Sequence, residues 1–159
     1  MPPESRLSDE DIRTFDEVRR FFVANPDPAC VPLFLASFAD DMGTGVYQLC
    51  DDVFAAYSQS TLTPHLADAM RSPHKGVRWW AAHWAVQFSA LELFEPQKAL
   101  VGRPDEADAH RFALSAICVI LEATKDTSVA AFLRDRAATE SDPELRDVIL
   151  DCLRANTAV

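Results

Sequence analysis

The sequence predicts an all-α fold, and three observations support this prediction. Only 4 of the 159 residues are glycine, which leaves few positions for the tight turns of a many-stranded sheet. No long segment alternates β-branched and polar residues, as a half-buried strand would. Proline recurs directly after a residue that can cap a helix, in Asp27-Pro28, Thr63-Pro64, Ser72-Pro73 and Asp142-Pro143. Each dipeptide predicts a helix start, because the first side chain accepts a bond from an exposed helix N–H and proline has no N–H to lose.

These start signals and the spacing of apolar residues predict nine helices. The first runs from Ser8 to about Ala24, and one side of it carries Ile12, Phe15, Val18, Arg19 and Phe22. The others are expected at 28–38, 45–58, 64–70, 74–89, 96–101, 105–124, 128–139 and 143–154. In the helix at 74–89, the spacing i, i+3, i+4, i+7 and i+11 predicts a core face made of Val77, Trp80, Ala81, Trp84 and Phe88.

The eight helices after the first group into four successive pairs. The second helix of each pair begins near residues 45, 74, 105 and 143. The distance along the chain between successive starts is that of a helix-pair repeat. One such pair cannot bury its apolar face alone, and stacked pairs can. We therefore predict a single domain over residues 1–159, with residues 1–7 flexible.

Two of these pairs resemble the HEAT-like repeat. Leu66–Pro73 followed by Val77-Arg78-Trp79-Trp80-Ala81-Ala82 is similar to its pattern of a first helix, an Asp-Pro-type turn and Val-Arg-x-x-Ala-Ala. The segment 132–153 is similar too, with Leu145-Arg146 at the Val-Arg position. The resemblance implies a right-handed α-solenoid of about four HEAT-like helix pairs with an N-terminal capping helix. It also implies that Arg78 and Arg146 bond to acidic or backbone oxygens of the next repeat.

The net charge of −10 bears on the kind of partner. Repulsion from phosphates makes this chain unsuited to general nucleic-acid binding. Residues 1–60 hold 11 acidic and 4 basic side chains, whereas residues 61–159 hold 14 and 11. The N-terminal part is therefore the better candidate for docking a basic partner.

The sequence offers no pattern typical of a metal site or of common enzyme classes. The cysteines have no CxxC spacing, and the histidines lack the HExxH spacing. GxSxG, P-loop and GxGxxG motifs are absent as well. We expect no metal, no cofactor and no enzymatic activity. The four cysteines, Cys30, Cys50, Cys118 and Cys152, are interpreted as small buried apolar residues in a reducing compartment.

The chain is expected to be cytoplasmic and not to enter a membrane. Its start, Met1-Pro2-Pro3-Glu4, lacks the basic and apolar regions of a signal peptide. No apolar run reaches the roughly 20 residues that cross a bilayer.

The repeat register predicts a partner-binding stripe. Aligning Val46, Val77 and Leu145 puts Gln48, Trp79 and Asp147 at one equivalent position, and Asp52, His83 and Asp151 four residues later. Arg111 of the third pair and Asp51 complete the set. Acids beside a Trp and a His suit recognition of a basic protein surface. The alternative is a solvated face on which Trp79 is half-buried against a neighbouring repeat. Asp51 and Asp52 also fall in the middle of the helix expected at 45–58, where aspartate is a poor helix former.

The function predicted from these patterns is that of a small binding protein that blocks or scaffolds another protein. The segment 38–54 is similar to immunity proteins of bacterial toxin systems, which implies that the chain occludes the active site of a cognate toxin. One alternative is a scaffold or regulatory subunit of a larger assembly. Another is a HEAT-fold lyase-type enzyme with a small-ligand pocket near Trp79 and His83; a DNA-base glycosylase would need a basic groove.

Overall fold

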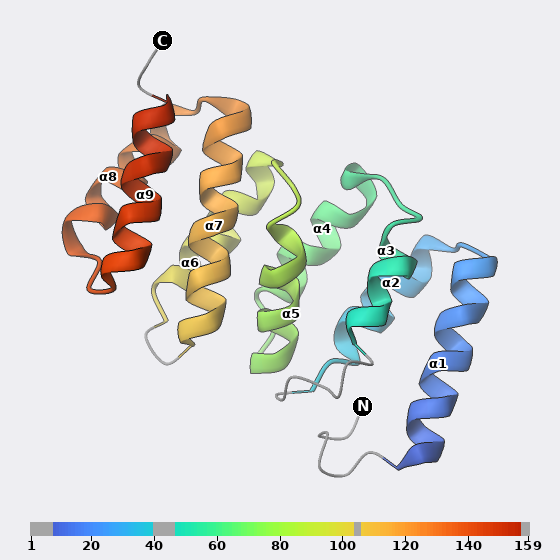
Figure 1. The fold of residues 1–159 in the computed structure, drawn as a ribbon. Helices are drawn as coiled ribbons and strands as arrows, with labels where there is room; N and C mark the ends of the chain where they lie inside the picture. Colours follow the sequence, from blue (N-terminus) through green and yellow to red (C-terminus); the bar gives the residue numbers. More distant parts are fainter. Residues whose placement is uncertain (1–7, 40–46, 104–105, 157–159) are drawn as a thin grey trace. The chain divides into compact units, whose positions relative to one another are not determined.

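The computed structural model describes residues 8–39, 47–103 and 106–156, and this part of the chain is all-helical (Figure 1). Its α-helices are α1 Asp9–Ala24, α2 Val31–Ala36, α3 Asp51–Phe54, α4 Gln59–Ala69, α5 Lys75–Ala85, α6 Phe94–Val101, α7 Ala107–Thr124, α8 Thr127–Thr139 and α9 Pro143–Asn156. Short 3₁₀ turns precede α2, α3 and α6, at Pro28–Cys30, Gln48–Cys50 and Leu91–Leu93. The all-α prediction is confirmed. The prediction that residues 1–7 are flexible lies outside the described residues.

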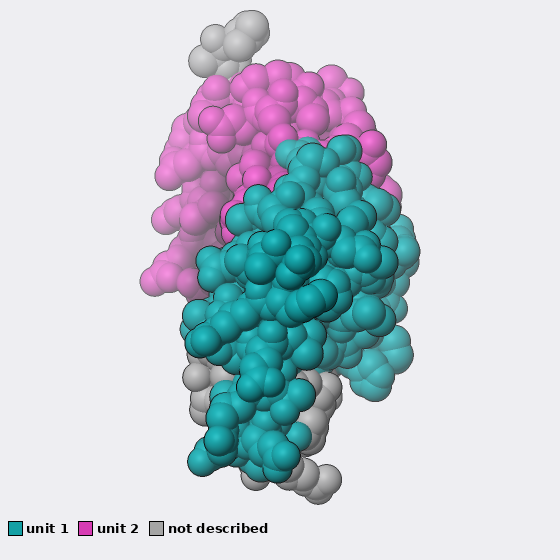
Figure 2. All heavy atoms as spheres, turned by 90° about the vertical axis from the view of Figure 1, so that its right-hand side faces the viewer, with its two compact units in different colours: residues 1–81 teal, residues 82–159 magenta. Residues whose placement is uncertain are grey.

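The chain divides into two compact units, residues 1–81 and residues 82–159 (Figure 2). In unit 1, α2 packs against α4 and α1 packs against α3. In unit 2, α6 packs against α7, and α7, α8 and α9 pack against one another. The pairings of α6 with α7 and of α8 with α9 are the expected ones. The single domain and the solenoid arrangement of the whole chain stay predictions.

Several helices begin at the capping residues that the sequence indicates. The Ser8 hydroxyl accepts a hydrogen bond from the Asp11 N–H, and the Asp11 carboxylate accepts one from the Ser8 N–H, which makes a complete capping box at α1. Asp142 accepts bonds from the N–H groups of Glu144 and Leu145 at the start of α9, with Pro143 in the first turn.

Three expected helices are wrong in extent. The helix expected at 74–89 ends at Ala85, so Phe88 lies beyond it and is only half-buried, not part of the buried face. The helix expected at 64–70 begins at Gln59, because Ser58 supplies its cap by accepting a bond from the Thr61 N–H. The Thr63 hydroxyl instead donates to the Gln59 carbonyl, and Pro64 lies inside the helix. Pro64 is the sixth of the eleven residues of α4, where its missing N–H removes one backbone hydrogen bond of the helix.

The helix expected at 45–58 is a 3₁₀ turn followed by the four-residue α3; its first two expected residues lie outside the described part. Asp51 and Asp52 are therefore not in mid-helix. They occupy the first turn of α3, where negative charge is favourable beside the helix N-terminus. Their position has a structural reason that does not require a partner.

The core of unit 1 is aromatic. Phe15, Phe34, Phe38, Tyr47 and Trp80 are all buried, and neighbouring rings meet at centroid distances of 4.9 to 5.9 Å. Most of these contacts are edge-to-face, the arrangement that the ring quadrupoles favour. The core of unit 2 is mainly aliphatic instead and is built from Ala, Leu and Ile of α7, Val and Leu of α8, and Leu and Ile of α9.

The two helices that carry the Val-Arg or Leu-Arg pair share one hydrogen-bond pattern. Arg78 donates to the Ser72 carbonyl at 2.7 Å, and the Nε of Arg146 donates to the Glu140 carbonyl at 3.1 Å. Each acceptor lies six residues upstream, in the turn before the arginine's own helix. These bonds close the turn before the arginine's own helix, and the expected bonds to the next pair stay a prediction.

Candidate functional site

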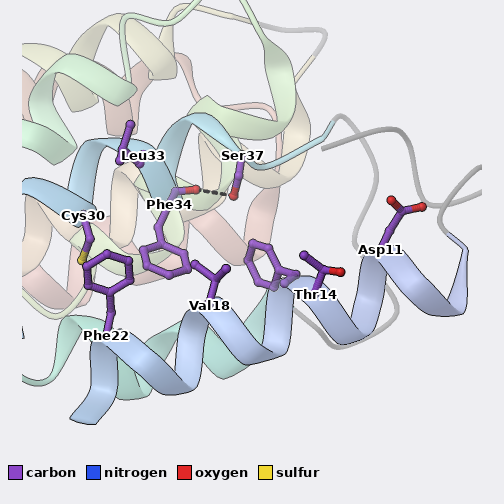
Figure 3. A pocket seen from close by; sticks show the side chains of 9 residues that line it. Asp11, Thr14, Val18, Phe22, Cys30, Leu33, Phe34 and Ser37 are labelled. Carbon is purple, nitrogen blue, oxygen red and sulfur yellow. Dashed lines mark hydrogen bonds between the residues drawn. The ribbon is translucent and has the colours of Figure 1, made fainter. Parts of the chain in front are cut away.

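An apolar groove between α1 and α2 is the strongest candidate binding surface of unit 1 (Figure 3). Its volume is about 400 Å³. Helix α1 contributes Asp11, Thr14, Phe15, Val18 and Phe22, and the segment from the 3₁₀ turn through α2 contributes Cys30, Leu33, Phe34 and Ser37. The groove thus has an apolar floor with a carboxylate and two hydroxyls at one end.

The local sequence explains why these side chains share a groove. Thr14, Val18 and Phe22 are spaced four residues apart on α1, so they form one row along the helix. The Phe34 ring packs edge-on against Phe15 at 5.8 Å and against Phe22 at 5.9 Å. These three rings join α1 to α2 and form the floor.

The groove's rim exposes apolar surface. Leu33 is 69% exposed and Val18 is 44% exposed. Phe21, whose ring packs against that of the lining residue Phe22, is 58% exposed. A single exposed apolar side chain is ordinary on a protein surface. Several that adjoin an apolar groove are typical of a surface that binds a macromolecule.

Acidic side chains outnumber basic ones in this part of unit 1. The described residues from 8–39 and 47–60 hold eight carboxylates and three arginines. Hydrogen bonds from the Ser8 side chain and backbone lower the pKa of Asp11, so the groove keeps a negative charge at its end. Arg19 donates to Asp16 at 2.8 Å and to Asp52 at 3.1 Å, which leaves less positive charge to offset the acids.

Three residues of the predicted stripe in unit 1 come from one short segment. Gln48, Asp51 and Asp52 are exposed on the 3₁₀ turn and α3. Asp52 is already engaged by Arg19 of α1. Trp79 is half-buried on α5, where its ring meets Trp80 at a centroid distance of 4.7 Å.

The other stripe residues lie in unit 2, where most of them have partners in the protein. His83 is half-buried, and its ring packs edge-on against Phe112 of α7 at 5.0 Å. Arg111 forms long ion pairs with Asp142 at 3.5 Å and Glu144 at 3.9 Å. Asp151 pairs with Arg154 on the same helix. Asp147 is exposed on α9. Because the stripe joins residues of both units, its continuity stays a prediction.

Of the groove residues, sequence reasoning assigned only Phe15, Val18 and Phe22 to a helix face. The available signals were the consecutive apolar residues Phe21-Phe22-Val23 and the almost entirely apolar run Val31-Pro32-Leu33-Phe34-Leu35. A run that is apolar on all sides cannot be fully covered by one neighbouring helix. Its uncovered side, Leu33, is the exposed one.

A polar cleft of about 450 Å³ lies in unit 2. Its charged lining is balanced, because Arg103, Arg111 and Arg136 face Asp108, Glu140 and Asp142. The buried Glu140 carboxylate accepts bonds from His110 at 2.9 Å, from Arg136 at 2.8 Å and from the Asp142 N–H at 3.0 Å. These bonds hold α7, α8 and the start of α9 together, so the network has a structural role.

The described residues contain no cluster of three or more His, Cys, Asp or Glu side chains that could hold a metal ion. Among the described helices, none combines the length and the apolar character needed to span a bilayer. No protein-family model matches the chain, and no curated protein or solved structure matches it either.

Proposed function

We propose that this chain is a protein-binding module whose partner docks in the apolar groove between α1 and α2. The observation that carries this proposal is the groove itself, in which an aromatic floor adjoins the exposed side chains of Val18 and Leu33. Burying such surface against a partner is favourable at about 25 cal/mol per Å². Exposed apolar groups that are already held on two helices need little ordering when a partner binds.

Charge complementarity indicates the chemistry of the partner. The groove ends at the ionised Asp11, and the surrounding segments carry an excess of acids. The matching partner presents a row of apolar side chains flanked by Lys or Arg. An amphipathic helix with apolar residues at i, i+3, i+4 and i+7 has this arrangement. Acidic residues outside the groove would speed its association and make the rate depend on salt.

The finer proposal is that the chain inhibits a basic partner, in the way that an immunity protein blocks a toxin. It rests on the similarity of segment 38–54 and on the exposed acids Asp51, Asp147 and Asp151. In this version the groove anchors the partner. The acids, Trp79 and His83 then contact the partner around its active site, which the chain occludes.

A pair of synthetic helical peptides tests the groove. One carries Leu at i, i+3, i+4 and i+7 with Lys on the flanks, and the other has the same Leu residues with Glu on the flanks. Binding is measured by fluorescence anisotropy at several salt concentrations. We expect the Lys peptide to bind more tightly, and Leu33→Asp or Val18→Asp to weaken it by about tenfold or more.

Val148→Asp is the matched control, because Val148 is an apolar residue of α9 that is 46% exposed, much like Val18. Circular dichroism checks that all variants stay folded. Equal binding to wild type and Leu33→Asp would contradict the groove proposal. If the chain instead self-associates, light scattering will show a dimer that Leu33→Asp dissociates, and the groove's occupant is then a second copy.

The inhibitor version has its own test. The protein encoded by the adjacent gene is purified and titrated with this chain, and both binding and loss of the partner's toxic activity are measured. We expect 1:1 binding that Trp79→Ala and Asp51→Lys weaken. Binding without any loss of activity would exclude the inhibitor version and leave the binding module.

A further inference from the structure

Two of the four cysteines, far apart in the sequence, come together in unit 2. Cys118 lies on α7 and Cys152 on α9, and these helices pack against each other. The Cys152 Sγ lies 3.7 Å from the Cys118 carbonyl oxygen, to which it donates. Both residues are partly exposed to solvent.

The surroundings make the two thiols unequal. A hydrogen bond from the Cys118 side chain lowers the pKa of Cys152, with help from the charge of Lys125 and a bond from Asn156, against burial and the charge of Glu122. The same hydrogen bond, with burial, raises the pKa of Cys118. Cys152 is therefore the better thiolate, and Cys118 stays the thiol beside it.

A small network orients the polar groups around Cys152. The Lys125 Nζ donates to the Asn156 Oδ1 at 2.6 Å, and the Asn156 Nδ2 lies 3.9 Å from the Cys152 Sγ. Lys125 ends α7 in a left-handed conformation with φ 54°, so the turn itself places this cation near α9. An ammonium and an amide donor near one sulfur favour its anionic form.

The other two cysteines have the environment of packing residues. Cys30 is 1% exposed and lies 3.4 Å from the Tyr57 hydroxyl. Cys50 is fully buried, and burial is the main reason that its pKa rises to about 12. The expectation of inert, buried cysteines therefore suits Cys30 and Cys50 but does not suit the partly exposed pair.

We propose that Cys152 and Cys118 are an oxidation site at which a peroxide converts the two thiols into an intramolecular disulfide. The Cys152 thiolate attacks one peroxide oxygen, the O–O bond breaks, and the other oxygen leaves as water (from hydrogen peroxide) or as an alcohol after taking up a proton. Cys152 is then a sulfenic acid. The Cys118 sulfur attacks the Cys152 sulfur, the S–O bond breaks, and the hydroxyl group leaves as water with the proton that the Cys118 thiol loses. Overall, two thiols are oxidised by two electrons and the peroxide is reduced.

The consequence of the disulfide is a covalent link between α7 and α9. It would close a loop of 34 residues that includes all of α8. A link of this kind restricts the unfolded chain, so oxidation is expected to raise the Tm of unit 2. A thiol reductant reverses it.

The test uses the reduced full-length chain and hydrogen peroxide. Intact mass is expected to fall by two hydrogens, and peptide mapping is expected to join the peptides of Cys118 and Cys152. With Cys118→Ser, the sulfenic acid has no partner and should be trapped on Cys152 by dimedone. With Cys152→Ser, dimedone labelling should be lost. Cys50→Ala is the matched control and should still form the disulfide.

The rate of alkylation by iodoacetamide tests the positioning role of Lys125. With Lys125→Gln, the pH midpoint for alkylation of Cys152 should move upward, and oxidation at neutral pH should slow several-fold. The proposal is overturned if wild type keeps both thiols under conditions that oxidise an unstructured cysteine peptide. It is also overturned if dimedone labels Cys118 or Cys30 in preference to Cys152.

Discussion

The Nε2 atom of His110 lies 2.9 Å from the Oε2 atom of Glu140, and both side chains are buried. His110 belongs to α7, and Glu140 directly follows α8. The Glu140 carboxylate also accepts from Arg136 and from the Asp142 N–H, and its backbone carbonyl accepts from Arg146. One glutamate therefore connects α7, α8 and α9, and most of the stability predictions for unit 2 depend on it.

Replacing Glu140 by Gln should destabilise unit 2. The variant keeps the size of the side chain but removes the charge that Arg136 neutralises at 2.8 Å. Breaking a buried, charge-assisted network is expected to cost about 2–3 kcal/mol of unfolding free energy, measured by urea denaturation. Asp151→Asn is the control, since its ion pair with Arg154 is exposed and should change stability by less than about 1 kcal/mol. Equal effects of the two substitutions would contradict the role of burial.

The same carboxylate makes stability depend on acid pH. Burial alone would raise the pKa of Glu140, but bonds from the Asp142 N–H, His110 and Arg136, with the charge of Arg136, lower it from 4.5 to about 2. Because the pKa is lower in the folded state, the carboxylate contributes stability above pH 4.5, and this stability is lost as pH falls toward 2. Denaturation across this range should show a smaller loss for Glu140→Gln than for wild type. Parallel curves would mean that another group causes the loss.

Gln97 of α6 offers a stabilising substitution. Its side chain is fully buried, and neither amide atom has a hydrogen-bond partner among the described residues. A buried polar group without a partner costs about 1–3 kcal/mol. Gln97→Met has a similar length and removes that cost, so its Tm should be higher than that of wild type. Gln97→Glu buries a charge at the same place and should lower the Tm. A lower Tm for Gln97→Met would show that the Gln97 amide has hydrogen-bond partners.

The floor and rim of the apolar groove should respond differently to truncation. Phe34 is 4% exposed and touches Phe15 and Phe22, so Phe34→Ala should cost about 3–4 kcal/mol of unfolding free energy. Leu33 is 69% exposed, so Leu33→Ala should change stability by less than about 0.5 kcal/mol. The same Leu33 substitution should weaken peptide binding. A large stability loss with Leu33→Ala would mean that the rim belongs to the core.

Replacing the more buried of the two turn-closing arginines should cost more unfolding free energy. Arg78 is 6% exposed, whereas Arg146 is an exposed residue, although both donate to a carbonyl six residues upstream. Arg78→Met should therefore cost about 2 kcal/mol and Arg146→Met about 1 kcal/mol or less. Thermal denaturation of both variants measures the difference. The reverse order would show that the bond to the turn is not the main contribution of these side chains.

Sequence reasoning was most successful for features that depend on residues close together in the sequence, such as helix starts. The cap at Ser8 and the Asp-Pro start of α9 are where their patterns indicate. The predicted face of α5 is buried at Val77, Trp80, Ala81 and Trp84, whereas Phe88 lies beyond the end of the helix. Sequence reasoning was less successful where two local signals competed. Thr63-Pro64 looked like a helix start, but Ser58 was an equally good cap five residues earlier and allowed a longer helix. The choice between them depends on packing against α2, which no local pattern contains.

The sequence by itself determined the all-α class, most helix starts, the apolar faces of α1 and most of that of α5, and the excess of negative charge. These follow from side-chain chemistry within a few residues along the chain. Only the tertiary structure decided which exposed and polar groups meet. It left Leu33 uncovered beside Val18, joined His110 to Glu140, and placed Cys118 next to Cys152. Contacts between residues 15 to 34 positions apart depend on how whole helices pack, and that information is spread over the entire core.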